Sequence, residues 1–145
     1  MKRELKLINC DFAKLHQHLS GSFFLRSLLS EENVEVELFD IIKLDGNKTY
    51  SNISFTNRKD YLASYNLKKL EAKLDARFFF RIHNSTIINL LHIKTIVNGK
   101  QKTVILTNEY SLSVSRRNWS RFMTRINELK QGDIGSQFSS ASSPN

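Results

Sequence analysis

Apolar and polar residues alternate along much of the chain, which is the pattern of half-buried β-strands. Residues 34–38 alternate without a break, and residues 93–97 and 103–106 flank the turn pair Asn98-Gly99, the strongest hairpin signal in the sequence. Residues 45–48 predict another turn, because they tolerate a positive φ. Further strands are expected over residues 23–27, 41–44, 50–55, 61–65, 78–80, 87–88 and 111–115. The pattern therefore predicts a mainly β fold.

Three segments have helical periodicity instead. Residues 5–19 repeat apolar positions near helical spacing and end at the helix-breaking run 20–22. Asn66 is a candidate side-chain cap for a short leucine-striped helix. Ser115 is a candidate cap for a last helix, which Gly132 would end and whose apolar stripe consists of Trp119, Phe122, Met123, Ile126 and Leu129.

These elements suit one domain with two short appendages. We expect an N-terminal helical extension over residues 1–21, the main domain over residues 22–130, and a disordered tail over residues 131–145, where Gly, Ser and Pro dominate. The extension could dock on the domain, pair with a second copy of the chain or bind another partner. The sequence leaves these three alternatives open.

Composition narrows the class of protein. No run approaches the roughly 18 apolar residues of a membrane span, and the charged amino end is not followed by a secretory signal, so we expect a cytoplasmic protein without membrane insertion. The single cysteine, Cys10, excludes an internal disulfide and a multi-cysteine zinc site. It could be a redox sensor, although the sequence offers no second thiol.

The positive charge is concentrated in one half of the chain. The net charge is +8, but residues 1–57 carry seven Lys/Arg against eight Asp/Glu, whereas residues 58–130 carry fifteen against five. Such asymmetry is typical of a surface that binds a polyanion, and a merely solvated basic face is the alternative.

Several motifs follow one another in a recognisable order. They are N-L-K-K-L at 66–70, R-F-F-F-R-I-H-N-S at 77–85, I-I-N at 87–89, H-I at 92–93 and L-S-V-S-R-R at 112–117. In order and spacing, residues 22–127 resemble the LytTR family of bacterial DNA-binding domains.

The resemblance implies packed antiparallel β-sheets with one or two short helices, and transcription regulation as the function. Family members insert loops, rather than a recognition helix, into successive major grooves of double-stranded DNA and usually recognise imperfect direct repeats. We therefore expect a homodimer on promoter DNA. Most members also carry a phospho-acceptor receiver domain, but only about 21 residues precede the match here, too few for a receiver.

Four residues are candidates for reading bases. The resemblance places Asn84 where the family presents Asn or Arg to the groove, and an Asn carboxamide fits the N6/N7 edge of adenine. Arg117 opens the last helix, and its guanidinium fits the O6/N7 pair of guanine. Tyr50 and Lys48 stand near a loop position where some members use a His. The alternatives are a turn Asn that bonds its own backbone and a solvated first helical turn.

Another set of residues is expected to contact the DNA backbone or to lie on plain surface: Arg81, Arg116, Arg121, Arg125, Lys100, Lys102 and Asn47. We interpret His83 as a structural hydrogen-bonding residue, because no second metal ligand has suitable spacing. Arg77, Ser85 and Asn89 are expected to anchor loops. Trp119 and Phe78 to Phe80 could stack on bases, but their spacing favours the core.

Other functions remain as alternatives. The charge also allows an RNA-binding or nonspecific nucleic-acid protein. A degenerate domain of this family could instead be an interaction module that inhibits, or is held by, a regulatory protein partner. We expect no cofactor, no metal and no enzymatic activity, because the sequence has no paired carboxylates, phosphate-cradling glycine loop or metal cluster at useful spacing.

Overall fold

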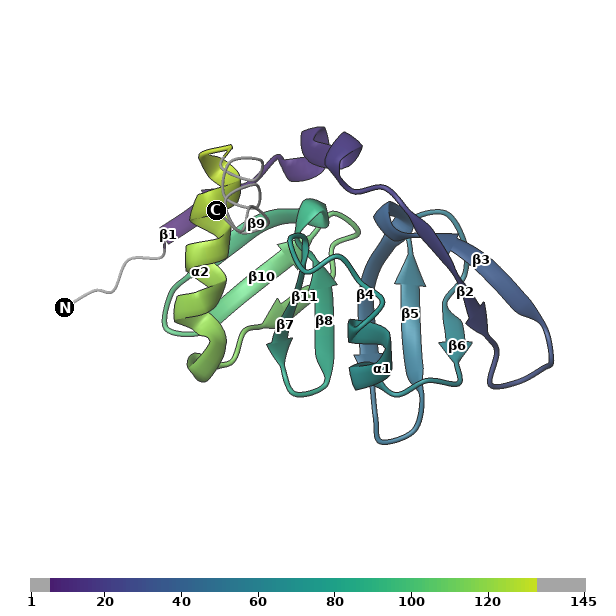
Figure 1. Cartoon of the computed structure of the whole chain (residues 1–145). Helices are drawn as coiled ribbons and strands as arrows, with labels where there is room; N and C mark the ends of the chain where they lie inside the picture. Colours follow the sequence, from purple (N-terminus) through teal and green to yellow (C-terminus); the bar gives the residue numbers. More distant parts are fainter. Residues whose placement is uncertain (1–5, 133–145) are drawn as a thin grey trace, which may run out of the picture.

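The computed structural model describes residues 6–132, which form three antiparallel sheets and two α-helices (Figure 1). The largest sheet has five strands in the order β6-β5-β4-β8-β7. Its strands are β4 Ile41–Gly46, β5 Ser51–Phe55, β6 Tyr61–Ala63, β7 Phe79–His83 and β8 Thr86–Asn89. All four residues of β8 are buried, the polar Thr86 and Asn89 at its ends included, so its two isoleucines do not alternate with exposed residues.

A four-stranded sheet carries the C-terminal helix. Its order is β1-β9-β10-β11, with β1 Lys6–Asn9, β9 Ile93–Asn98, β10 Lys102–Leu106 and β11 Ser111–Ser113. Helix α2, Arg116–Lys130, buries Phe122, Ile126 and Leu129 and reaches across to β7, where Phe122 packs on Phe80 with ring centroids 5.5 Å apart. Helix α2 therefore joins the four-stranded sheet to the five-stranded one.

The third sheet is a hairpin at the opposite end of the molecule from α2 (Figure 1). It consists of β2 Ser22–Arg26 and β3 Asn33–Glu37. The hairpin connects to the five-stranded sheet through β6, because Leu28 N donates to Leu62 O at 2.9 Å and Ser64 N donates to Arg26 O at 2.9 Å.

Both predicted helix caps are confirmed. Asn66 accepts a hydrogen bond from Lys69 N at the start of α1, Leu67–Glu71, and Ser115 accepts one from Asn118 N at the start of α2. The mainly β fold is confirmed as well, and the buried Phe78, Phe79 and Phe80 belong to the core rather than to a stacking surface. Trp119 is half-buried and packs on Phe122.

The helix predicted over residues 5–19 is wrong. Residues 6–9 form strand β1, which pairs with β9, and Phe12–His18 form a 3₁₀ helix. Further short 3₁₀ turns are Leu38–Asp40 and Leu90–His92. The apolar residues of this segment dock on the domain: Phe12 and Leu19 are buried, and Ile8 packs against the core. The helical spacing of apolar residues gave the wrong prediction because β1 is a short edge strand. The sequence pattern of such a strand is weak, and its pairing with β9 determines its secondary structure.

The turn glycines also act differently from the prediction. Among residues 6–132, a positive φ occurs at Gly21, Gly132 and Glu109, and so at neither Gly46 nor Gly99. Gly46 is needed for space instead, since a Cβ there would lie 2.9 Å from the Cβ of Leu67 in α1. Gly132 follows the C-cap of α2 as expected. The tail predicted to be disordered lies, from residue 133 onward, outside the described residues.

Two buried polar side chains fix the 3₁₀ turns beside the five-stranded sheet. Asn89 donates from Nδ2 to Ile41 O at 2.9 Å and accepts from Leu91 N at 2.9 Å. His92 donates from Nε2 to Phe39 O at 2.6 Å, and burial lowers the pKa of its imidazole despite that hydrogen bond and the charge of Asp40. Within the described part of the chain, no helix has the length and apolarity needed to cross a bilayer.

Candidate nucleic-acid interface

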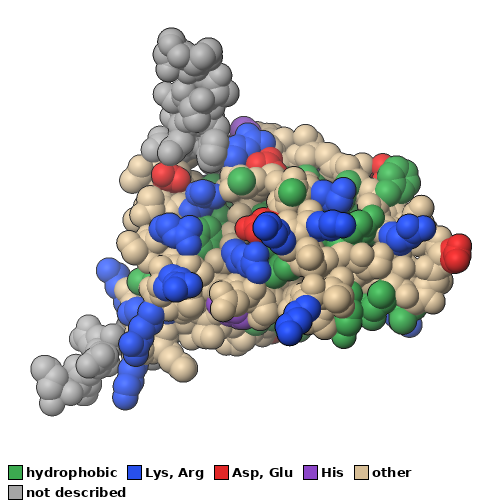
Figure 2. Space-filling view, turned by 60° about the horizontal axis from the view of Figure 1, so that its bottom comes forward, with side chains coloured by type: hydrophobic (Ala, Val, Ile, Leu, Met, Phe, Trp, Pro, Cys, Tyr) green, Lys and Arg blue, Asp and Glu red, His purple; other side chains and the backbone are tan. Residues whose placement is uncertain are grey.

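Three connecting segments share one edge of the molecule, the lower edge in Figure 1. They are the β4–β5 loop, the β7–β8 turn and the start of α2, and they contain most of the residues singled out from the sequence. Lys and Arg side chains are spread over this face and greatly outnumber acidic ones (Figure 2). The edge therefore has the charge expected of a polyanion-binding surface.

The β4–β5 loop and the β7–β8 turn are held side by side. Gly46 N donates to Ser85 O at 2.9 Å, and Thr86 Oγ1 donates to Asp45 at 2.9 Å. Leu67 of α1 packs so closely on Gly46 that no larger residue fits. The positions of the two loops are therefore fixed relative to each other by hydrogen bonds and by packing, as a reading surface requires.

Inside the β4–β5 loop, Asn47 shapes the turn. Its Oδ1 accepts from Thr49 N at 3.0 Å and Tyr50 N at 3.1 Å, which occupies the amide oxygen with local backbone. Lys48 is exposed at the tip, whereas Tyr50 is half-buried. The Lys48 side chain makes no hydrogen bond or ion pair with another described residue.

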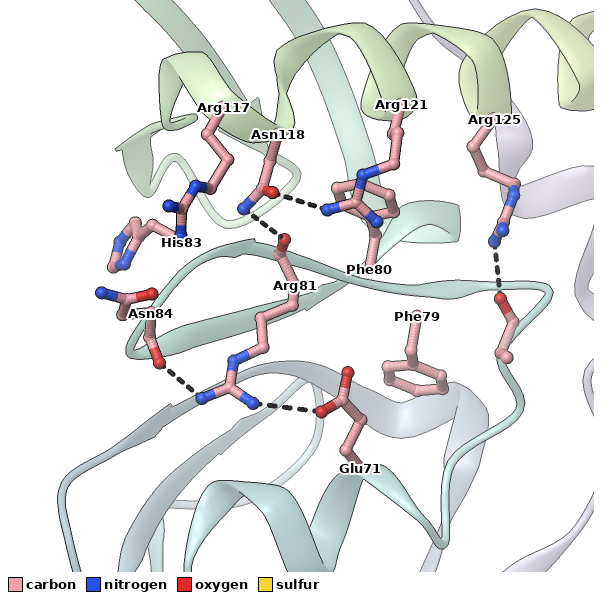
Figure 3. A pocket seen from close by; sticks show the side chains of 11 residues that line it. Glu71, Phe79, Phe80, Arg81, His83, Asn84, Arg117, Asn118, Arg121 and Arg125 are labelled. Atoms are coloured by element: carbon pink, nitrogen blue, oxygen red, sulfur yellow. Dashed lines mark hydrogen bonds and ion pairs between the residues drawn. The ribbon is translucent and has the colours of Figure 1, made fainter.

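A groove of about 410 Å³ runs between the β7–β8 hairpin and the first three turns of α2 (Figure 3). Phe79 and Phe80 contribute apolar lining. The charged lining is four arginines and one glutamate, namely Arg81, Arg117, Arg121, Arg125 and Glu71. The groove thus brings together arginines that lie up to 44 positions apart in the sequence.

Arg81 is fixed across the mouth of the groove. Its Nη1 donates to Glu71 Oε1 at 3.1 Å and its Nη2 to the carbonyl oxygen of Asn84 at 2.6 Å. The second bond fixes the backbone of the β7–β8 turn while leaving the Asn84 carboxamide unused (Figure 3). His83 closes the same turn, since its Nδ1 accepts from Ser85 N at 3.2 Å.

Asn118 connects α2 to the same strand. The side chain is buried, at 8% exposure, and its Nδ2 donates to Arg81 O at 3.3 Å. Its Oδ1 accepts from Arg121 Nη2 at 2.6 Å, and the Arg121 guanidinium also lies over the Phe80 ring. A further bond, from Ser115 N to Ile82 O at 2.9 Å, fixes the first turn of α2 against the end of β7.

Arg125 lies deeper along the groove and is used for packing. Its Nη1 donates to the carbonyl oxygens of Ala76 at 2.5 Å and Arg77 at 3.3 Å, and its Nε lies 3.5 Å from Glu128. These contacts connect α2 to the segment before β7. Arg77 in turn donates to Asp75 and to His18 O; burial alone would raise the pKa of Asp75, but the bonds and charge of Arg77 lower it overall.

Arg117 and Asn84 differ from these arginines. Both are exposed, and neither side chain makes a hydrogen bond or ion pair with another described residue. The two come from α2 and from the β7–β8 turn, 33 positions apart in sequence, yet they lie together at one end of the groove beside His83 (Figure 3). Their donors and acceptors are therefore available to a ligand.

A second basic hollow, of about 260 Å³, lies beside the start of α2. Its charged lining is Lys100, Lys102 and Arg116. Lys102 is partly engaged, since its Nζ donates to Asn98 Oδ1 at 2.6 Å and lies over the Trp119 ring. Lys100 and Arg116 are exposed. Basic side chains thus line a hollow beside the first turn of α2 as well.

Sequence reasoning missed Glu71, Asn118 and the packing role of Gly46. Asn118 follows two arginines and looks like one more polar residue of a first helical turn. Its partner Arg81 O lies 37 positions away, so no local pattern could show the contact. Residues 6–132 contain no group of three His, Cys, Asp or Glu placed to hold a metal.

Cys10 lies at the carboxyl end of α2, in a hollow lined also by Leu129 and Lys130. Burial raises the pKa of its thiol to about 11, although Lys130 acts in the opposite sense. At neutral pH the group is therefore a poor nucleophile, which argues against a redox sensor.

Comparison with known proteins gives a consistent result. The family model of the LytTr DNA-binding domain matches residues 31–127. The sensory transduction protein LytR of Staphylococcus epidermidis is 32% identical over 99 residues, which are 66% of this chain and 39% of that protein. The transcriptional regulatory protein LytR of Staphylococcus aureus strain N315 is 35% identical over 92 residues, 62% of this chain and 37% of that protein.

The chain thus spans less than two fifths of the length of these relatives. Among solved structures, it resembles the LytTr DNA-binding domain of a putative methyl-accepting/DNA response regulator from Bacillus cereus. The TM-score is 0.61 at 20% identity, and the match covers 72% of this chain and 95% of that one. This last likeness concerns the fold alone.

Proposed function

The chain belongs to the LytTR family of DNA-binding transcription regulators, and from this premise we propose that it reads specific double-stranded DNA with Asn84 and Arg117. The observation that carries the proposal is the pairing of these two side chains at one end of the groove, exposed and without protein partners. A reading residue needs donors and acceptors that the protein itself has left unused.

The mechanism has two parts. The basic edge attracts the duplex through phosphate contacts, which give an affinity that depends on salt but not on sequence. The exposed Arg116 and Lys100 are the main proposed contributors to this part. Lys102 and Arg121 each hold a bond to an asparagine side chain and would contribute through their remaining N–H donors. Arg117 then donates to a guanine edge and Asn84 bonds an adenine edge in the major groove, with Lys48, and Tyr50 next to it, at a neighbouring position.

Arg81 and Arg125 have a different place in this proposal. Their guanidinium groups already donate to Asn84 O and to Ala76 O, so reaching a phosphate would require breaking those bonds. We assign to both a positioning role, in which they fix the turn and the helix that carry the two reading residues.

Two copies are proposed to occupy direct repeats, in keeping with the family resemblance. Each copy would present the same edge to the same face of the duplex, so both would have the same orientation along the DNA. A single protected half-site under saturating protein would contradict this arrangement.

The testing experiment is selection of random duplex DNA by the chain, followed by titration of the selected site and of random duplex at two salt concentrations. Arg117→Ala should lose about 1–3 kcal/mol on the selected site and relax the preference at one base pair. Equal losses on selected and random DNA would show that Arg117 contacts only phosphate.

Lys59→Ala is the matched control. Lys59 is exposed in the β5–β6 turn, on the edge opposite the reading loops, and its replacement removes the same single charge. Lys59→Ala should lower the affinity for selected and for random DNA equally, and only slightly. A selection that enriches no motif at all, with binding that vanishes as salt rises, would reject sequence-specific reading.

A further inference from the structure

Exposed apolar side chains gather on the β2–β3 hairpin. Phe24, Leu28 and Leu29 are 62%, 43% and 80% exposed, and they are three of the five large hydrophobic residues exposed among residues 6–132. Figure 2 shows apolar side chains gathered toward the same end of the molecule. A clustered set of this kind on an otherwise polar surface marks a contact site more often than scattered single residues do.

The same hairpin is acidic. Residues 22–40 carry five acidic residues and one basic residue, Arg26. Glu35 and Glu37 pair across the strands with Phe24 and Ser22, so these four side chains share the outer face of the hairpin. Glu31 and Glu32 lie in the exposed turn beside Leu29. We call this set of glutamates and the three apolar residues the hairpin surface.

Two occupants are unfavourable for the hairpin surface. DNA is excluded by like charge, because the glutamates would repel its phosphates. A second hairpin surface would bring glutamates against glutamates, which argues against a symmetric contact. The negative charge and the exposed apolar residues of the hairpin surface together favour a partner with lysines beside exposed apolar residues.

The opposite end of the molecule offers such a surface (Figure 1). Strand β1 is an edge strand of the four-stranded sheet, and its Leu7 is 60% exposed. Leu7 pairs with the half-buried Val97, and Lys6 pairs with Asn98, next to the turn that carries the exposed Lys100. We call Lys6, Leu7, Val97 and Lys100 the β1 end.

We propose that the hairpin surface of one copy docks on the β1 end of the next copy, head to tail along the DNA. The inference rests on the proposed function. Copies in the same orientation turn unlike ends toward each other, and the hairpin and β1 lie at opposite ends of the molecule (Figure 1). Acidic and apolar groups of one copy then meet basic and apolar groups of its neighbour.

The contact is too small to hold copies together in free solution. Three apolar side chains and a few charges are far below a stable interface. DNA supplies what is missing, because two copies on adjacent half-sites face each other at a high effective concentration. The expected result is a monomer off DNA and cooperative binding on DNA.

The experiment compares duplexes with one selected half-site and with two in direct repeat, at constant salt. Wild type should fill the paired sites with cooperativity of about tenfold. The double variant Leu28→Ser, Leu29→Ser and the single variant Leu7→Ser should each lose it while binding the single half-site as wild type does. Tyr110 is the remaining exposed large apolar residue among residues 6–132 and lies outside both surfaces, so Tyr110→Ser is the control and should keep the cooperativity.

Mixing the two variants tests the head-to-tail geometry. The double variant retains a β1 end and Leu7→Ser retains a hairpin surface, so one of their two orders on the paired site restores a full contact. Partial recovery of cooperativity is expected in the mixture. No recovery, or cooperativity unchanged in the separate variants, would overturn the proposal while single-site binding still upheld the proposed function. A wild type with no preferred half-site would reject both.

Discussion

Two parts of helix α2 present arginines on the same stripe, yet their environments differ. Arg125, in the middle of the helix, donates to the carbonyl oxygens of Ala76 and Arg77 and lies near Glu128. Arg117, in the first turn, is exposed and makes no polar contact within the described part of the chain. Spacing of four residues places them on one face, but only the surrounding elements decide which one stays available.

The difference separates the side chains that make this edge rigid from those that are available to a ligand. Bonds of Arg81, Asn118 and Arg125 fix the β7–β8 turn and α2 against each other. The side chains without such bonds, Asn84 and Arg117, project from that fixed frame. Substitutions in the frame should therefore act on the free energy of unfolding, and substitutions at the projecting residues on binding.

The largest effect is expected at the centre of the frame. Asn118→Ala leaves Arg81 O without its buried donor and releases Arg121, so the free energy of unfolding should fall by about 1–3 kcal/mol. Urea denaturation measures it. Asn127→Ala, at an exposed position of the same helix, should change stability by less than about 0.5 kcal/mol. Equal effects of the two would mean that the Asn118 bridge contributes nothing.

A crossed pair of variants then tests the division between the two arginines. Arg125→Met keeps much of the aliphatic stem but removes the bonds to two carbonyl oxygens, and should lower the free energy of unfolding by about 1–2 kcal/mol with little change in the affinity for DNA. Arg117→Met should lower the affinity for DNA with little change in the free energy of unfolding. The measurements are urea denaturation and titration of the selected duplex. Comparable losses of affinity in both variants would show that Arg117 and Arg125 do not differ in their role toward DNA.

Much of the fold follows from local signals. The caps at Asn66 and Ser115, the hairpin around residues 98–101 and the apolar stripe of α2 all depend on neighbours within a few residues, and all were predictable. Strand β1 was not, because its pairing with β9 joins residues about 90 positions apart. Edge strands of four residues carry too little pattern to outweigh an accidental helical spacing.

The same distinction between sequence neighbours and distant contacts applies to the candidate site. Motif and charge indicated Asn84 and Arg117, whose environment in the structure leaves both unused by the protein. Sequence could not separate Arg117 from Arg125, since the partners of Arg125 lie 48 and 49 positions away. Nor could it show that Glu71 pairs with Arg81, a contact made between α1 and β7.

The pair of Glu71 and Arg81 provides a smaller test. Glu71 is the one acidic side chain among the described residues that line the groove. Glu71→Gln removes a negative charge beside the expected path of the DNA, and should raise affinity about two- to threefold at low salt with the gain lost at high salt. Stability should change by less than about 1 kcal/mol, because the pair is partly exposed. An equal gain at all salt concentrations would argue against a charge effect.

The smallest effect is expected at a buried polar group of the core, outside the frame that holds Asn84 and Arg117. His92 is buried and neutral, and its pKa is lowered chiefly by desolvation. The unfolded chain therefore takes up a proton at higher pH than the folded one. The contribution of His92 is complete above its ordinary pKa of 6.5 and is lost as the pH falls below that value toward the folded pKa.

Urea midpoints at pH 7.5 and pH 5.5 test this, with His92→Gln as the comparison, because Gln can still donate to Phe39 O but does not titrate. Wild type should lose more stability over this interval than the variant, and selected DNA at pH 7.5 should bind both equally. Identical pH dependence in the two proteins would show that His92 is protonated in the folded state as readily as in the unfolded one. A weaker affinity of the variant for DNA would instead show that the Leu90–His92 turn also helps to position Asn84 and Arg117. The set of positioning residues would then have to include His92.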